Sequence, residues 1–287
     1  MPSWKKFVVA MLIAAAAPFA YAAEIERTGG RFVPTPIVVV QQMLRIGNIG
    51  PKDYVIDLGS GDGIIVLTAA TQNQASGMGF DIDPDLVKLS NAEAAKRGVA
   101  DRAKFAVQDV FKVDLSKASV VTTYLLPGMM MNLREKIYTE LKPGSRVVSH
   151  DYHFSDWRPD DQFSFDVPEK EKVNGVPMAT VYLWIIPAKV GGRWKVNVEG
   201  GDAYEVALKQ TWQNIEGAAT PTGKAAVRLS NPVIRGEDIS FAVGAGNSRL
   251  AFTGKVNGAA MQGTVDLGGG KSAKWSATRV VEQAAAK

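Results

Sequence analysis

The sequence predicts an α/β domain built on a mostly parallel sheet, followed by a smaller all-β domain. Three observations lead to this prediction. Apolar strands alternate with helical patterns between residues 37 and 149, a rhythm typical of a parallel sheet with helices on both faces. An apolar strand at 54–58 runs through a glycine-rich turn directly into an apolar helix. After residue 190 no long helical pattern follows, and short alternating runs take over.

Length and composition agree with a two-domain globular protein. The chain has 287 residues, of which 46% are hydrophobic, enough for two domains with sizeable cores. Two of the positive charges, Lys5 and Lys6, lie in a segment that we expect to be removed. The formal charge of +4 then falls to +2, which gives no argument for a nucleic-acid partner. The absence of cysteine excludes disulfides, thiol nucleophiles and cysteine-ligated zinc.

Residues 1–22 are predicted to form a secretory signal peptide. Lys5 and Lys6 make a basic start, residues 7–17 are apolar, and Ala20-Tyr21-Ala22 supplies an A-x-A cleavage motif. The apolar run is short for a membrane span, although an uncleaved inner-membrane anchor is the alternative. The prediction is therefore a periplasmic or secreted protein that begins at Ala23.

The first domain is expected to span residues 23–190. Thr35 as N-cap and Pro36 at the first helical position start one helix, and Asp83 with Pro84 starts another in the same way. The predicted elements are helix 37–46, strand 54–58, helix 64–70, strand 77–80, helix 84–97, strand 104–107, strand 119–126, helix 129–141 and strand 146–149.

The end of this domain and the whole of the next are predicted to be antiparallel. Strands 162–167 and 178–186 would pair across a loop that contains Asn174-Gly175, with the more apolar second strand inside the sheet. Residues 191–287 carry short alternating runs separated by turn signals, the pattern of a small barrel or sandwich.

Polar residues gather where the parallel strands end. In open α/β sheets ligands bind beyond the carboxyl ends of the strands. The residues expected there are Asp57, Gly59, Gly61, Gly63, Asp81, Ile82, Asp109, Val110, Tyr124, His150 and Asp151. A dinucleotide site expects the spacing G-x-G-x-x-G, whereas this loop has G-x-G-x-G with Asp62 inside it. Because a carboxylate repels a pyrophosphate, a sulfonium cofactor without phosphate is favoured over NAD.

Three motifs carry a resemblance to a known family. The chain contains VIDLGSGDG at 55–63, GFDIDP at 79–84 and QDVF at 108–111, and it resembles the class I S-adenosylmethionine-dependent methyltransferases with their Rossmann-like fold. More narrowly, VPTP at 33–36, TTYLLPGMM at 122–130 and LKPGSRVVSHDYHFSDW at 141–157 resemble bacterial relatives of the lysine N-methyltransferases that act on the c-subunit of ATP synthase. Relatives often carry Arg after the third glycine, where this chain has Ile64.

The resemblance implies S-adenosylmethionine as cofactor and assigns each strand-end residue a role. The implied contacts are the backbone at Gly59, Gly61 and Gly63 beneath the methionine part, Asp57 toward the ammonium, Asp81 on both ribose hydroxyls, Ile82 on the adenine, Asp109 on the adenine amino group and the Val110 amide on a ring nitrogen.

The acceptor side is assigned to the later strand ends. A lysine acceptor must be neutral to attack, and an apolar, aromatic site lowers its pKa. Tyr124 is the candidate for holding the acceptor, and His150 and Asp151 are candidates for receiving or relaying a proton. No metal is predicted, and Met129-Met130-Met131 is assigned to helix packing.

The sequence thus predicts methyl transfer to a protein lysine. The alternatives are an exported cofactor-binding or scaffold protein without catalysis, and a small-molecule or lipid methyltransferase. The expected partner is a substrate protein, with membrane association only through the N-terminal segment and no nucleic acid.

Overall fold

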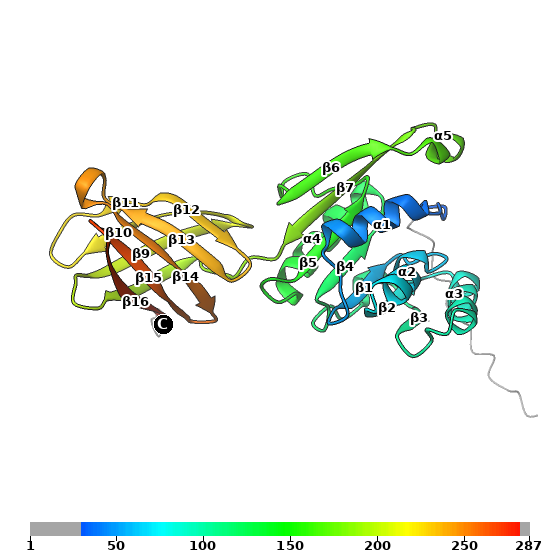
Figure 1. Ribbon diagram of the computed structural model, residues 1–287, viewed down its shortest axis with the longest axis horizontal. Coiled ribbons are helices and arrows are strands. Elements are labelled where there is room, and N and C mark those ends of the chain that lie inside the picture. Colours follow the sequence, from blue (N-terminus) through cyan, green and yellow to red (C-terminus); the bar gives the residue numbers. More distant parts are fainter. Residues whose placement is uncertain (1–29, 282–287) are drawn as a thin grey trace, which may run out of the picture.

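The computed structural model describes residues 30–281, so the predicted signal peptide lies outside the described residues. Two sheets form the molecule and lie side by side in Figure 1. The first has the strand order β3-β2-β1-β4-β5-β7-β6, and the second has the order β11-β10-β9-β8-β16-β15-β14-β13-β12. An α/β domain followed by an all-β domain is confirmed.

The first sheet is parallel from β3 to β5, and β7 and β6 complete it in antiparallel pairs. Its strands are β1 (Tyr54–Leu58), β2 (Ser76–Asp81), β3 (Ala103–Val107), β4 (Val120–Thr123), β5 (Arg146–His150), β6 (Asp161–Asp166) and β7 (Met178–Ile185). The helices are α1 (Ile37–Ile46), α2 (Ile64–Gln72), α3 (Pro84–Lys96), η1 (Val110–Lys112), α4 (Pro127–Glu140) and α5 (Pro168–Asn174).

Helices cover both faces of this sheet because the central strands are apolar on both sides. In β1, Val55 belongs to the core shared with α1 and α2, whereas Ile56 belongs to the core shared with α4. Successive side chains of a strand point to opposite faces, so a run without polar alternation buries both. The carboxyl ends of β1, β2 and β4 are thereby held at one edge, between fixed helices.

Two local predictions were wrong. Thr35 does not cap α1, because Pro36 is the N-cap and its carbonyl accepts the first helical hydrogen bonds, from Val39 and Val40. The connection between β6 and β7 is not a simple loop, because Pro168 starts the short helix α5 and Gly175 ends it with a φ of 76°. A left-handed residue of this kind commonly closes a helix.

The second sheet curls into a nearly closed antiparallel barrel, which we call the β domain. Its strands are β8 (Gly192–Val198), β9 (Ala203–Thr211), β10 (Asn214–Pro221), β11 (Val227–Arg228), β12 (Ser230–Arg235), β13 (Asp238–Val243), β14 (Leu250–Asn257), β15 (Ala260–Gly268) and β16 (Lys271–Arg279), with η2 (Gly246–Ser248) before β14. Strands β10 and β12 approach each other, which brings the sheet toward closure. Trp194, Phe252 and Trp275 fill its interior.

One tryptophan of the β domain packs on the first domain instead. Trp212, in the turn between β9 and β10, stacks on Trp157 at 4.8 Å between ring centroids and meets Tyr138 edge-on at 5.0 Å. The Arg134 guanidinium lies 5.3 Å from the Trp212 ring, and Gln213 donates to the Arg158 carbonyl. These contacts fix the β domain against α4. Within residues 30–281, no helix is both long and apolar enough to cross a membrane.

Replacing Trp212 with Ala should separate the domains without unfolding either. The change removes a buried aromatic contact worth about 3 kcal/mol, so we expect faster proteolysis in the connection at 186–191 and a lower midpoint of urea unfolding. Leu267→Ala, at a side chain that is 37% exposed on a distant hairpin, is the matched control. Equal proteolysis of both variants would contradict the interface.

Candidate functional site

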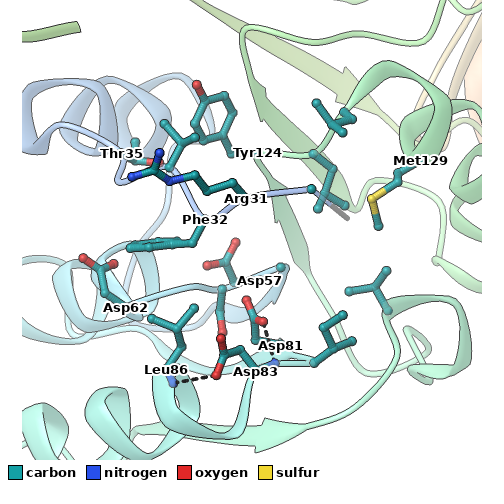
Figure 2. Close-up of a pocket in the computed structure, with 18 of the residues that line it drawn as sticks. Arg31, Phe32, Thr35, Asp57, Asp62, Asp81, Asp83, Leu86, Tyr124 and Met129 are labelled. Atoms are coloured by element: carbon teal, nitrogen blue, oxygen red, sulfur yellow. Dashed lines mark hydrogen bonds between the residues drawn. The ribbon is translucent and has the colours of Figure 1, made fainter. Parts of the chain in front are cut away.

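A cavity of about 770 Å³ opens at the carboxyl ends of β1, β2 and β4. Segment 30–35, which precedes α1, forms one wall. Figure 2 shows Asp57, Asp62, Asp81 and Asp83 gathered in the lower part of the view, with Tyr124 above them and Met129 to the right. With Asp109, five carboxylates and one guanidinium (Arg31) line this cavity. Such an excess of negative charge favours a cationic ligand and disfavours a phosphate.

The glycine loop after β1 needs its glycines for different reasons. Gly59, Gly61 and Gly63 have φ values of 76°, 53° and 79°, which only glycine adopts readily. Gly59 lines the cavity. A Cβ on Gly61 would collide with the ring of Phe32, and a Cβ on Gly63 would lie 2.7 Å from the ring of Phe105. Of the three predicted ligand-facing glycines, only Gly59 faces the cavity.

Asp57 is a buried carboxylate with one unpaired oxygen. Its Oδ1 accepts a hydrogen bond of 2.6 Å from Thr122 Oγ1 on β4. Its Oδ2 is buried and has no hydrogen-bond partner within residues 30–281. Burial raises the pKa of Asp57 to about 7, the bond from Thr122 opposes the shift, and the charges of Asp81 and Asp62 add to it. An unpaired carboxylate oxygen at the cavity wall fits an ammonium group.

Asp81 presents both carboxylate oxygens at the end of β2. Oδ2 accepts from the Gly61 amide at 2.8 Å, and Oδ1 accepts from the Asp83 amide at 3.0 Å. Each oxygen retains acceptor capacity, because a carboxylate has about four lone-pair sites. The side chain lines the cavity beside Ile82, so a vicinal diol can be bound there.

Asp109 and Val110 also line this cavity. Asp109 precedes η1, and its Oδ1 accepts from the Phe111 amide at 3.0 Å. Val110 is buried, and Phe111 joins both residues in the cavity wall. A polar acceptor beside apolar side chains suits a flat heterocycle with an exocyclic amine. All predicted cofactor residues other than Gly61 and Gly63 therefore line one cavity.

The predicted catalytic residues do not all line the cavity. Tyr124 lines the cavity, and its ring centroid lies 4.0 Å from that of His150 and 6.1 Å from that of Tyr152. His150 is buried behind Tyr124, and burial lowers its pKa to about 4. Asp151 binds the ammonium of Lys170. Among these three predicted residues, only Tyr124 is part of the cavity wall.

Sequence reasoning missed several residues of the site. Arg31, Phe32 and Tyr152 line the cavity, and so does Met129, for which the sequence predicts only packing. Met129 lies in the first turn of α4, next to the strand ends, whereas Met130 is fully buried. A usable signal for Phe32 is its place directly before the extended segment that enters α1. Among residues 30–281, no cluster of His, Asp or Glu side chains could hold a metal ion.

Comparisons with known proteins converge on methyltransferases. Residues 57–161 match the model of the ANTKMT methyltransferase domain. The chain is 38% identical over 156 residues to a protein-lysine N-methyltransferase of Saccharolobus islandicus, a match that covers 92% of that protein and 54% of this chain. It is 34% identical over 152 residues to the ATP synthase c-subunit lysine N-methyltransferase of Xenopus laevis, covering 66% of that enzyme and 53% of this chain.

A solved structure is also similar in sequence. The RNA methyltransferase from Salinibacter ruber, in complex with S-adenosyl-L-homocysteine, is 43% identical and has a TM-score of 0.49; the match covers 96% of that chain and 55% of this one. The human ATP synthase c-subunit lysine N-methyltransferase is 33% identical over 129 residues, so this chain spans about half of that enzyme's length.

Asp57→Asn should remove a pH dependence of stability. The pKa of Asp57 is raised in the folded state, so the folded protein holds a proton that the unfolded chain loses near pH 3.8. The stabilisation that this group contributes to the folded state is therefore complete below pH 3.8 and is lost as the pH rises to about 7. Without cofactor, we expect D57N to be more stable than wild type at pH 8 by about 2–4 kcal/mol, and similar at pH 4.

Urea unfolding at several pH values measures this difference. Asp85→Asn, at an exposed carboxylate, is the control and should follow the wild-type profile. Parallel profiles for D57N and wild type would show that Asp57 titrates normally.

Proposed function

This chain belongs to the family of class I S-adenosylmethionine-dependent methyltransferases that contains the protein-lysine N-methyltransferase of Saccharolobus islandicus, and we propose that it methylates a lysine amine of a protein. One observation carries the proposal. The acidic part of the cavity, around Asp57 and Asp81, adjoins an apolar and aromatic wall formed by Leu126, Tyr124 and Tyr152. The first part fits the cofactor, and the second fits an aliphatic amine.

The chain's own side chains fit S-adenosylmethionine. The unpaired Oδ2 of Asp57 would accept from the ammonium, the two oxygens of Asp81 would accept from the ribose hydroxyls, and Asp109 would accept from the adenine amine. When bound, the cofactor supplies an electrophilic methyl group that an amine lone pair displaces from sulfur, leaving a neutral thioether and releasing one proton. The protein therefore has to align the amine and exclude water.

The aromatic wall prepares the acceptor for this reaction. An ammonium that enters an apolar site loses hydration, so its pKa falls and the neutral amine becomes more populated. The faces of Tyr124 and Tyr152 attract the remaining cationic form by cation–π interaction. In this proposal His150 supports Tyr124 from behind, and the ammonium loses its proton to solvent as it enters the apolar site, before water is excluded and the methyl group is transferred.

The N-terminal segment supports a proposal about the location of the protein. We infer export from the basic start, the apolar run at 7–17 and the Ala20-Tyr21-Ala22 motif. Fractionation of the native host followed by N-terminal sequencing should find a periplasmic or secreted protein that starts at Ala23. Recovery with Met1 intact in the membrane fraction would support an anchored protein instead.

Labelling with methyl-labelled S-adenosylmethionine tests the proposed activity. Native membrane and soluble proteins are the acceptors, and acid hydrolysis of the labelled product identifies the modified residue. We expect methyl-lysine. Label in lipid, in small molecules or in another residue would contradict the lysine assignment.

Asp81→Asn should lower both cofactor affinity and transfer. Loss of the charged acceptor removes hydrogen bonds worth about 1.5–3 kcal/mol, which corresponds to a decrease of about tenfold or more. Calorimetry with S-adenosylhomocysteine and the labelling assay both measure the effect. Asp85→Asn lies four residues along the same segment, at an exposed carboxylate, and should leave both readouts unchanged.

A further inference from the structure

A lysine buried behind the aromatic wall has no part in the function described so far. We propose that Lys170 is a positioning residue for methyl transfer: through Asp151 it holds the imidazole of His150 neutral and oriented beneath Tyr124. This inference rests on the proposed function for its link to the acceptor. Its structural part, the placement of Asp151 against His150 by Lys170, stands on the contacts alone.

Lys170 is held in place by two bonds. Its side chain is only 3% exposed, and its ammonium donates to Asp151 Oδ2 and, at 2.7 Å, to the carbonyl of Met178. The burial of an unpaired ammonium costs several kcal/mol, so the ion pair is needed to keep this side chain inside. The bonds join α5 to the first residue of β7 and to the residue that follows β5.

Asp151 is held just as firmly. Its φ of 59° is in the left-handed region, which costs a non-glycine residue about 1–2 kcal/mol. The backbone amide of Asp151 donates to the Thr180 carbonyl at 2.7 Å, and Oδ1 accepts from the Thr180 amide at 3.1 Å. With Lys170 on Oδ2, the carboxylate has a single orientation toward His150.

His150 takes its orientation from that carboxylate. The ring is fully buried, and neither ring nitrogen has a hydrogen bond within the described chain. Nε2 lies 3.4 Å from Asp151 Oδ2, a contact that favours the tautomer with hydrogen on Nε2. Burial is the largest influence that keeps this imidazole neutral; the charge of Asp151 favours the imidazolium, and the charge of Lys170 opposes it.

The neutral imidazole matters because Tyr124 packs on it. The two ring centroids are 4.0 Å apart and their planes are tilted by 31°. Lys170 and Asp151 neutralise each other while His150 stays uncharged, so the ring that packs on Tyr124 does not repel an incoming ammonium. Without the Lys170 cation, only burial opposes the carboxylate of Asp151, so the pKa of His150 rises. A larger share of the imidazole then carries a positive charge directly behind the wall that the acceptor contacts.

Lys170→Met tests this arrangement, because Met retains much of the volume and removes the charge. The chain contains two histidines, so long-range ¹H–¹⁵N spectra of the imidazoles resolve His150 with the exposed His153 as internal reference. We expect the ring nitrogen signals of His150, followed from pH 4 to pH 8, to titrate at a higher pH in Lys170→Met than in the wild type, with the His153 signals unchanged. S-adenosylhomocysteine affinity should stay within twofold, and transfer should fall at least tenfold at saturating cofactor. Lys170→Arg should restore the wild-type titration of His150 and most of the rate.

A second variant keeps the test decisive if Lys170→Met unfolds the protein. The double variant D151N/K170M has no unpaired buried charge, so it should fold and leave His150 neutral, with both tautomers visible. A wild-type His150 spectrum and a wild-type rate in either variant would overturn the proposal. If the wild-type protein labels no acceptor while the spectra change as expected, the proposed activity fails and the control of His150 by Lys170 remains.

Discussion

The hydrogen bond between Thr122 and Asp57 is the constraint around which the cavity is built. It joins the two central strands, β4 and β1, at the edge where they end, and it occupies only one oxygen of a carboxylate with no access to water. Helices on both faces of the sheet prevent that carboxylate from turning toward solvent. Gly59, Asp81 and the acceptor wall line the same cavity as this carboxylate, so the energetic cost of its burial would be offset when a cation binds.

The parts that could be predicted from sequence are those that depend on neighbours in the chain. Strand, turn and helix alternate within about thirty residues, and the strand ends of a parallel sheet must meet at one edge. Asp57, Asp81 and Asp109 therefore fall on one cavity, as predicted. The comparisons confirm the family resemblance and the cofactor, and the structure confirms an α/β domain followed by a β domain.

The parts that were missed depend on contacts between distant segments. Phe32 occupies the space above Gly61, and nothing near either residue in the sequence indicates the other. Lys170 lies in a run of Glu and Lys that is typical of a solvated helix, and only the fold brings it to Asp151. Trp212 has the pattern of a core residue in a small barrel but packs on Trp157. In each case tertiary packing decides between two locally acceptable positions.

The contact between Trp212 and Trp157 has a geometric consequence. Two stacked indoles, an edge-on tyrosine and a guanidinium leave the β domain little freedom to swing about its connection. A protein bound to the β domain would therefore lie at a constant distance from Tyr124. The β domain would then determine which lysine of a bound protein reaches the site, because each lysine lies at a different distance from the point of attachment.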